Sequence, residues 1–372
     1  MAASLFPSSS HPQHIHKKPF PLKVFAGEEA LAHIREQGLC ADDIAMVLGA
    51  SGGPKWLSLA AIDRYLLSHW FAQREKPLHL LGTSAGGWRL ACYAQQDPLA
   101  AHARFQEAYI SQNYSDQATA REIAEGCSHI LDEVLGEQGA EQIINHPVMR
   151  YHTIITRCRG LAASDQKQIQ TLGMAGALIA NLIARPAMRP FIERTLMHHP
   201  EKPPIDHFPH LPAAQATLTS QNLKPALLAT GAIPLVIAGV RHIAGAPKGT
   251  YRDGGISDYQ FDLPVFPDNG FVLYPHYFAR APKGGWFDKK LRWRSAARQH
   301  YKRTIIIAPS WEFAATLPGG RIPDLQDFRD YKYPQRRQRW DTALQQCEAL
   351  GEAMAELDQT NGWSKIVEPL PW

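Results

Sequence analysis

The stretch LHLLGTSAGGWRLACYA, residues 78–94, changes from an apolar run to a helix-forming run through the five small residues 82–86. Ser84 is the middle one, with Gly82 and Gly86 on either side. Glycine at these positions removes Cβ clashes and allows a sharp turn between a strand and a helix. Such a turn raises the serine side chain and points the free N–H groups of the new helix toward it. The stretch predicts a nucleophile elbow; the alternative is a serine that caps a helix in an ordinary glycine-rich loop.

A second strand, loop and helix unit precedes this one. The apolar run 44–48 is followed by a glycine-rich loop, GASGGPK at 49–55, and then by a helix-forming run that extends to about residue 71. Two such units in succession are typical of parallel strands joined by helices. We therefore expect an α/β protein with a mostly parallel central sheet flanked by helices.

The loop 49–55 can present backbone N–H groups to an anion, because it leads into the N-terminus of a helix. It does not match the P-loop pattern, since Pro54 and Trp56 replace residues that this pattern requires. The glycine pattern of Rossmann folds is also absent. The loop is a poor candidate for nucleotide binding and a good one for holding a tetrahedral oxyanion.

The remaining chain divides into segments by composition. The polar, proline-containing residues 1–25 predict a loosely structured leader. The pattern predicts helices at 101–145 and 335–358, a strand-rich stretch at 226–264, and strands at 271–274 and 304–308.

Composition limits the class of protein. Of the 372 residues, 45% are hydrophobic and 20% are charged, which supports a sizeable core and excludes global disorder. The net charge of +4 is too small to indicate a nucleic-acid partner by itself. The five cysteines are scattered without C-x-x-C spacing, so we expect free thiols in a reducing compartment and no zinc site.

No targeting or membrane segment is evident in the sequence. The N-terminal residues lack the apolar run of a secretory signal, and no window of about eighteen apolar residues occurs. We therefore expect a cytoplasmic protein. The pattern gives no indication of an oligomeric state.

Residues 172–183 form an apolar block that three arginines follow. These are Arg185, Arg189 and Arg194. One interpretation is a buried or half-buried helix that ends at Pro186. The other is an interfacial or lid helix with basic residues near lipid head groups. The basic, tryptophan-rich stretch 286–294 also suits an anionic interface, so we expect weak, salt-sensitive contact with anionic membranes.

Asp253 precedes two glycines in the sequence YRDGG, residues 251–255. An aspartate in this position can occupy a tight turn that leaves its carboxylate facing a neighbouring loop. On this segment alone, an ordinary Asp-Gly hairpin turn is the simpler interpretation.

Three motifs in this order resemble those of the patatin-like phospholipase family of serine acyl hydrolases. Residues 51–55, SGGPK, are similar to the glycine-rich oxyanion loop of that family, G-G-G-x-[RK]-G. Residues 82–86 match its G-x-S-x-G elbow, and 253–255 match its D-G-[GA] motif. The run 229–234, ATGAIP, is similar to the small-residue and proline run before its aspartate. The resemblance covers residues 49–255 and implies a patatin-like, three-layer α/β/α architecture. It also implies a hydrolase core at 40–265, and we expect a C-terminal extension that packs on this core at 266–372.

The sequence departs from the family pattern in the oxyanion loop, where Ser51 and Trp56 replace glycines. After Asp253 the family often continues to N-x-P, whereas this chain reads ISDYQFDLP up to residue 264. Asp258 and Asp262 are therefore alternative carboxylates, although neither is followed by two glycines.

The resemblance implies a Ser–Asp dyad that uses no histidine, no cofactor and no metal ion. Ser84 would attack an ester carbonyl, and Asp253 would accept its proton and pass it to the leaving alcohol. Three backbone N–H groups would hold the oxyanion, those of Gly52, Gly53 and Ala85. Lys55 would anchor the loop or bind an anionic substrate. The implied substrates are fatty acyl esters of phospholipids or lysophospholipids.

Two other functions are compatible with the pattern. One is a Ser–Asp–His esterase that acts on soluble esters, for which the candidate histidines are His207, His210, His242 and His276. The other is an inactive hydrolase core that binds lipid, or that binds nucleic acid through the stretch 286–294. Of these partners, nucleic acid is not expected.

Overall fold

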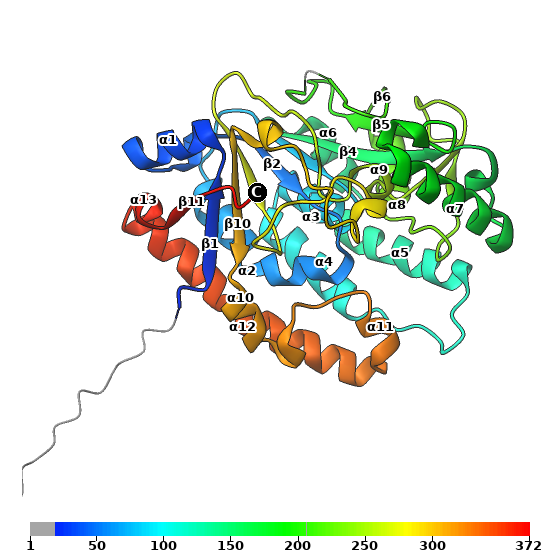
Figure 1. The fold of residues 1–372 in the computed structure, drawn as a ribbon. Coiled ribbons are helices and arrows are strands. Elements are labelled where there is room, and N and C mark those ends of the chain that lie inside the picture. The colour runs from blue at the N-terminus through cyan, green and yellow to red at the C-terminus, as the bar shows by residue number, and fades with distance from the viewer. Residues whose placement is uncertain (1–18, 206) are drawn as a thin grey trace, which may run out of the picture.

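The computed structural model describes residues 19–205 and 207–372. Within these ranges eleven strands form one sheet, whose main path runs β11-β1-β10-β9-β2-β3-β4-β5-β6 (Figure 1). The strands are β1 Leu22–Ala26, β2 Ile44–Gly49, β3 Leu78–Gly82, β4 Met149–Cys158, β5 Ile192–His198, β6 Ala213–Thr217, β7 Val240–Arg241, β8 Thr250–Arg252, β9 Phe271–Pro275, β10 Thr304–Pro309 and β11 Val367–Pro369. Six of the ten strand pairs are parallel, so the predicted α/β class with a mostly parallel sheet is confirmed.

Helices flank this sheet (Figure 1). They are α1 Glu28–Gln37, α2 Ala60–Tyr65, α3 Ala85–Tyr93, α4 Pro98–Ile110, α5 Ala120–Leu135, α6 Gly139–Asn145, α7 Lys167–Ile183, α8 Ser220–Thr230, α9 Gly255–Asp258, α10 Trp311–Thr316, α11 Asp327–Asp330, α12 Tyr333–Gln359 and α13 Trp363–Ile366. The helices expected at 101–145 and 335–358 are thus present, as α4 to α6 and as α12.

The four strands that the sequence predicts occur as β2, β3, β9 and β10. Their apolar runs suit central strands, because helices cover both faces of a parallel sheet. β2 and β3 pair in parallel up to Gly49 and Gly82. The two glycine-rich loops that follow these strands therefore begin side by side, at the same edge of the sheet.

The segment 266–372 contributes three strands to the sheet itself, although we expected it to pack on the core as an extension. β9 lies between β10 and β2, and β11 pairs with β1. The strand β1, Leu22–Ala26, overlaps the expected leader, and residues 1–18 of that leader lie outside the described residues. These pairings join distant parts of the chain, so a local pattern does not reveal them.

The strand-rich stretch predicted at 226–264 is largely wrong. Its first residues complete α8, which begins after a capping box formed by Thr219 and Asn222. In the rest of the stretch the strands β7 and β8 have only 2 and 3 residues. The small apolar residues at the start of the stretch form a helix because they pack against β4.

The apolar block at 172–183 lies on α7, which ends before Pro186 as expected. One side of α7 is buried, with Met174 and Ala177 in the interior, whereas several larger aliphatic residues are exposed. The helix is therefore half-buried. No helix in the described part of the chain combines the length and the apolar composition needed to cross a bilayer.

Candidate active site

Ser84 lies between β3, which ends at Gly82, and α3, which begins at Ala85. Its backbone has φ +54° and ψ −135°, a strained conformation that residues with a side chain rarely adopt. A Cβ on Gly86 would lie 2.3 Å from the carbonyl group of Gly49 at the end of β2. Glycine is therefore required where the first turn of α3 passes the neighbouring strand. The structure has the sharp strand-to-helix turn that the sequence predicts.

Thr230, at the end of α8, links this turn to β4 through hydrogen bonds. The backbone N–H of Ser84 donates to Thr230 Oγ1 at 2.9 Å, and the threonine hydroxyl donates to the carbonyl of Ile154 at 2.7 Å. Sequence reasoning did not identify Thr230 as a site residue. Its only signal was its place in the run 229–234.

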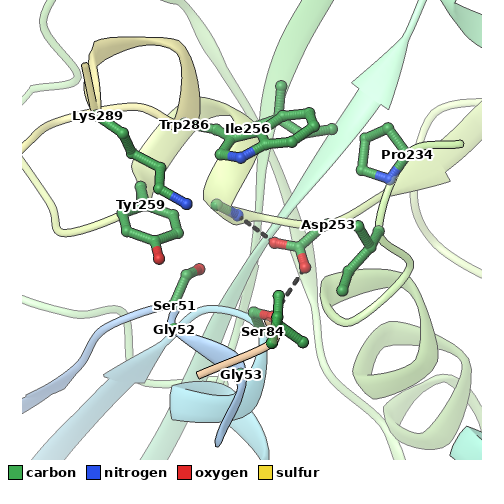
Figure 2. A pocket seen from close by; sticks show the side chains of 13 residues that line it. Ser51, Gly52, Gly53, Ser84, Pro234, Asp253, Ile256, Tyr259, Trp286 and Lys289 are labelled. Atoms are coloured by element: carbon green, nitrogen blue, oxygen red, sulfur yellow. Dashed lines mark hydrogen bonds between the residues drawn. The ribbon is translucent and has the colours of Figure 1, made fainter. Parts of the chain in front are cut away.

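Asp253 directly follows β8 and points toward Ser84 (Figure 2). Ser84 Oγ donates a hydrogen bond to Asp253 Oδ2 at 2.8 Å, the separation expected of a nucleophile and its base. The other carboxylate oxygen accepts the backbone N–H of Gly255 at 2.7 Å. The Asp-Gly-Gly turn therefore orients the carboxylate, and both side chains of the pair are buried.

Burial raises the pKa of Asp253 from 3.8 to about 7. The hydrogen bonds from Ser84 and Gly255 and the positive charge of Lys289 act in the opposite direction. The raised pKa affects how well Asp253 can act as a base, because a carboxylate with a pKa near 4 is a weak base at neutral pH. With a pKa of about 7, Asp253 is suited to accept a proton from a serine hydroxyl.

Three backbone N–H groups close to Ser84 are available as donors. They belong to Gly52 and Gly53, which line the pocket, and to Ala85, which follows the serine. Within the described residues, none of the three donates to a protein acceptor. Gly53 has φ +56°, a backbone conformation that favours glycine. Such donors can stabilise an oxyanion that develops beside Ser84.

Lys55 is not among the residues that line the pocket. Its side chain is buried, and its amine pairs with Asp324 and donates to the carbonyl of Gly52 at 3.4 Å. Of the two roles expected for Lys55, these contacts fit the anchoring of the loop. They leave the amine turned toward Asp324 rather than toward a substrate.

The pocket around Ser84 and Asp253 encloses about 80 Å³ and has a mainly apolar lining (Figure 2). The lining includes Ile233, Pro234, Ile256, Tyr259, Trp286, Lys289 and Leu325. The amine of Lys289 lies 4.5 Å from the centre of the Tyr259 ring. Sequence reasoning noted the basic stretch 286–294 only as a surface feature, because no motif marks Trp286 or Lys289 as pocket residues.

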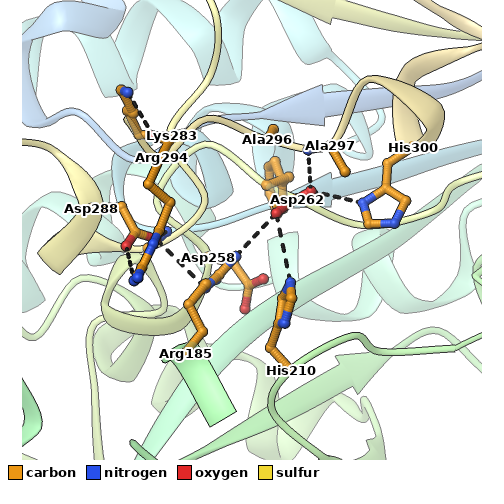
Figure 3. A network of polar contacts seen from close by, with 12 residues as sticks. Arg185, His210, Asp258, Asp262, Lys283, Asp288, Arg294, Ala296, Ala297 and His300 are labelled. Carbon is orange, nitrogen blue, oxygen red and sulfur yellow. Dashed lines mark hydrogen bonds and ion pairs between the residues drawn. The ribbon is translucent and has the colours of Figure 1, made fainter. Parts of the chain in front are cut away.

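The alternative carboxylates are engaged elsewhere. Asp258 accepts two hydrogen bonds from Arg194, at 2.6 and 2.8 Å. Asp262 lies 2.7 Å from His300 Nδ1, in a polar network that includes Arg185 and His210 (Figure 3). Neither carboxylate contacts Ser84, so the aspartate of the Asp-Gly-Gly motif is the one that the fold brings to the serine.

None of the four candidate histidines lines the pocket. His276 is buried, and its Nδ1 atom lies 2.8 Å from the carbonyl of Phe278. His210 faces Asp262 at 4.0 Å (Figure 3). Across residues 19–205 and 207–372, no histidine is placed to relay a proton from Ser84, and this geometry favours a dyad over a triad.

Two of the three arginines that follow the apolar block are not at the surface. Arg185 is buried and lies 3.3 Å from Asp262 and 3.5 Å from Asp288 (Figure 3). Arg194 is buried in its ion pair with Asp258. Contact with lipid head groups is therefore a wrong expectation for Arg185 and Arg194, because carboxylates of later segments hold them in the interior. Arg189 is exposed.

No protein-family model matches the chain, and no curated protein matches its sequence. Among solved structures, the chain is similar to the crystal structure of VipD from Legionella pneumophila, with a TM-score of 0.30 and 11% sequence identity. The alignment covers 83% of this chain and 67% of VipD. A similarity at this level carries no argument about function.

Proposed function

We propose that this protein is a serine hydrolase of carboxylic esters, with Ser84 as the nucleophile and Asp253 as the general base. The 2.8 Å hydrogen bond from Ser84 Oγ to Asp253 Oδ2 carries the proposal. The strained turn at Ser84, the raised pKa of Asp253 and the unpaired N–H groups of Gly52 and Gly53 support it.

The proposed reaction passes through an acyl-enzyme. Ser84 Oγ attacks the carbonyl carbon while Asp253 accepts the hydroxyl proton, and the backbone N–H groups hold the oxyanion. As the tetrahedral intermediate collapses, the proton passes from Asp253 to the leaving alkoxide, which departs as the alcohol. Water then attacks the acyl group and transfers a proton to Asp253. That proton returns to Ser84 Oγ as the carboxylic acid leaves.

The proposed substrate is a fatty acyl ester of a phospholipid or lysophospholipid. The order of motifs that resembles patatin-like phospholipases supports this class, and so does the mainly apolar lining of the pocket. The proposed site of action is the cytoplasmic surface of a membrane. All five cysteines are unpaired, which supports a reducing compartment.

A fluorophosphonate probe tests the nucleophile. We expect one label per chain, which peptide mass spectrometry locates on Ser84, and no label on the Ser84→Ala variant. A label on another serine would contradict the assignment. A folded protein that takes up no label would instead support the alternative of an inactive hydrolase core that only binds its ligand.

Lys289 provides a test of the substrate class. Among the described residues that line the pocket it is the only cation, so we expect it to bind a negatively charged group near the ester. The change Lys289→Met should lower kcat/KM for a 1-acylglycerol 3-phosphate by about tenfold or more, because a hydrogen bond to a charged group is lost. Turnover of the uncharged 1-acylglycerol with the same acyl chain should stay within about twofold.

The control for this test is Lys365→Met. Lys365 lies on α13, is exposed, and is not part of the pocket lining. It should leave both rates nearly unchanged. Equal losses on the charged and uncharged substrates in Lys289→Met would mean that this lysine supports the pocket structurally and does not read the substrate charge.

A further inference from the structure

The helix α7 presents its large aliphatic side chains to solvent. Leu172, Ile179 and Ile183 are 65%, 62% and 78% exposed, and Leu178 and Leu182 are also exposed. At helical spacing these residues share one side, which we call the aliphatic face. The opposite side is buried and consists of Met174 and four small or polar residues, namely Gln170, Gly173, Ala177 and Asn181. A surface helix normally has the reverse orientation, so the aliphatic face marks an interaction surface.

The neighbouring turn at Gly160–Ala163 packs against α7 and carries one more exposed aliphatic residue. A Cβ on Gly173 would lie 2.2 Å from the backbone nitrogen of Ala162, so glycine lets α7 contact this turn directly. Leu161 on the turn is 54% exposed. The exposed aliphatic residues therefore belong to two neighbouring segments.

The buried side of α7 supports one wall of the pocket. Gln170 Oε1 accepts the backbone N–H of Leu235 at 2.7 Å. The two residues before Leu235, Ile233 and Pro234, line the pocket. The aliphatic face is thus separated from the pocket wall by the thickness of a single helix.

The other end of α7 supports the segment that carries Lys289. Asn181 Nδ2 donates to Asp288 Oδ1 at 2.9 Å, and the Asn181 carbonyl accepts from Arg294 at 2.6 Å. Between Asp288 and Arg294 the chain reaches the surface, where Trp293 is 74% exposed. The exposed cations Lys290 and Arg292 accompany this tryptophan.

The composition of the combined surface indicates its partner. From Lys167 to Ile183, α7 has no acidic residue. An aliphatic helix face beside an exposed tryptophan and cations is typical of segments that lie in a membrane interface, where rings sit among head groups and cations attract anionic lipid. A twofold contact between two copies of this chain would instead bring like charges together.

We propose that the aliphatic face of α7, together with Lys290, Arg292 and Trp293, docks on an anionic lipid bilayer. The docking places the adjacent pocket at the membrane surface. This inference rests on the proposed function for the reason to be at a membrane, and it adds the surface that makes the contact.

Co-sedimentation with lipid vesicles tests the aliphatic face, with Ser84→Ala as the parent protein so that no lipid is hydrolysed. The added double change Ile179→Ser/Ile183→Ser should weaken binding to vesicles of phosphatidylcholine and phosphatidylglycerol by about tenfold or more, because two apolar side chains no longer enter the bilayer. The control Leu99→Ser/Trp311→Ser removes two exposed apolar residues of α4 and α10 and should bind as the parent does.

A charge reversal tests the cations. Arg292→Glu should weaken binding to the anionic vesicles by about fivefold or more and leave the weaker binding to pure phosphatidylcholine unchanged. Lys365→Glu on α13, which lies far from α7 (Figure 1), is the control and should have no effect. Binding of the parent to anionic vesicles should weaken as the salt concentration rises.

Undiminished vesicle binding by the folded Ile179/Ile183 double variant would overturn the inference. So would an unsubstituted protein that binds no vesicles and forms a dimer, if the double variant becomes a monomer in sedimentation velocity. Hydrolysis of a short soluble ester by the unsubstituted protein is measured in parallel. Hydrolysis without vesicle binding rejects only the docking surface, whereas vesicle binding without hydrolysis rejects only the proposed function.

Discussion

Replacing Ser84 with alanine should lower kcat for a short acyl ester by about 10⁴-fold or more, because the acyl-enzyme can no longer form. The stability of the folded protein should change little. Alanine adopts the φ of +54° with about the same strain as serine, and the main loss is one hydrogen bond to Asp253, worth about 1 kcal/mol. Initial rates and thermal unfolding on the same preparation measure both quantities.

Ser51 offers a matched control for this result, because it is a second serine of the pocket lining. Its Oγ donates to Thr83 Oγ1 at 2.9 Å and makes no contact with Asp253. Ser51→Ala should therefore retain most of the activity. If Ser84→Ala remained active, or if both variants lost activity equally, Ser84 would not be the nucleophile.

Replacing Asp253 with asparagine should lower kcat by about 10³-fold, since an amide cannot accept the serine proton. The pH dependence is a second signature. With a pKa of about 7, the unsubstituted protein should lose about tenfold in kcat/KM for each pH unit below 7 and show a plateau above it. The residual activity of Asp253→Asn should lack this decline in kcat/KM below pH 7. If the variant showed the same decline, the group that titrates near pH 7 would not be Asp253.

The same substitution should stabilise the fold at alkaline pH. Asp253 keeps its proton up to a pH of about 7 in the folded chain, but only up to about 3.8 in the unfolded chain. Unfolding between these values releases a proton, so stability falls as the pH rises from about 4 to 7 and is constant above that. Over this pH range the free energy of unfolding falls by about 4 kcal/mol in total. Urea unfolding should find Asp253→Asn more stable than the unsubstituted protein at pH 8, with the difference shrinking toward pH 4.

The parts of the fold and site that could be predicted are those that a short segment determines by itself. The loops after β2 and β3 contain the glycines that their tight backbone requires, so Ser84 could be found from its neighbours in the chain. Asp253 could not be found from its own segment, for which an Asp-Gly hairpin turn is the simpler interpretation. It could be predicted because its motif follows the two glycine-rich loops in the order of the family that the sequence resembles. The apolar runs of the four predicted strands are also local signals.

The remaining features depend on partners that are distant in sequence. Lys55 had two expected roles, and its pairing with Asp324, 269 residues away, distinguishes them. Thr230 and Lys289 reach the site only because α8 and the segment after β9 fold against it. The orientation of α7 could not be predicted either, since an apolar block does not say which of its residues will be buried.

The position of β9 has a consequence for how the protein is made. β9 separates β10 from β2, and β1 pairs only with β10 and β11, so the half of the sheet that contains the first strand is completed by the last third of the chain. During translation β1 emerges early and has no partner strand until β10 is synthesised, while β2 keeps an open, apolar edge. Such edges aggregate readily, and long-range pairing is slow to form. The nascent chain therefore has an unpaired β1 and an open edge at β2 until residues 271–309 have been synthesised, and a chain that stops at residue 265 would expose the middle of its own sheet.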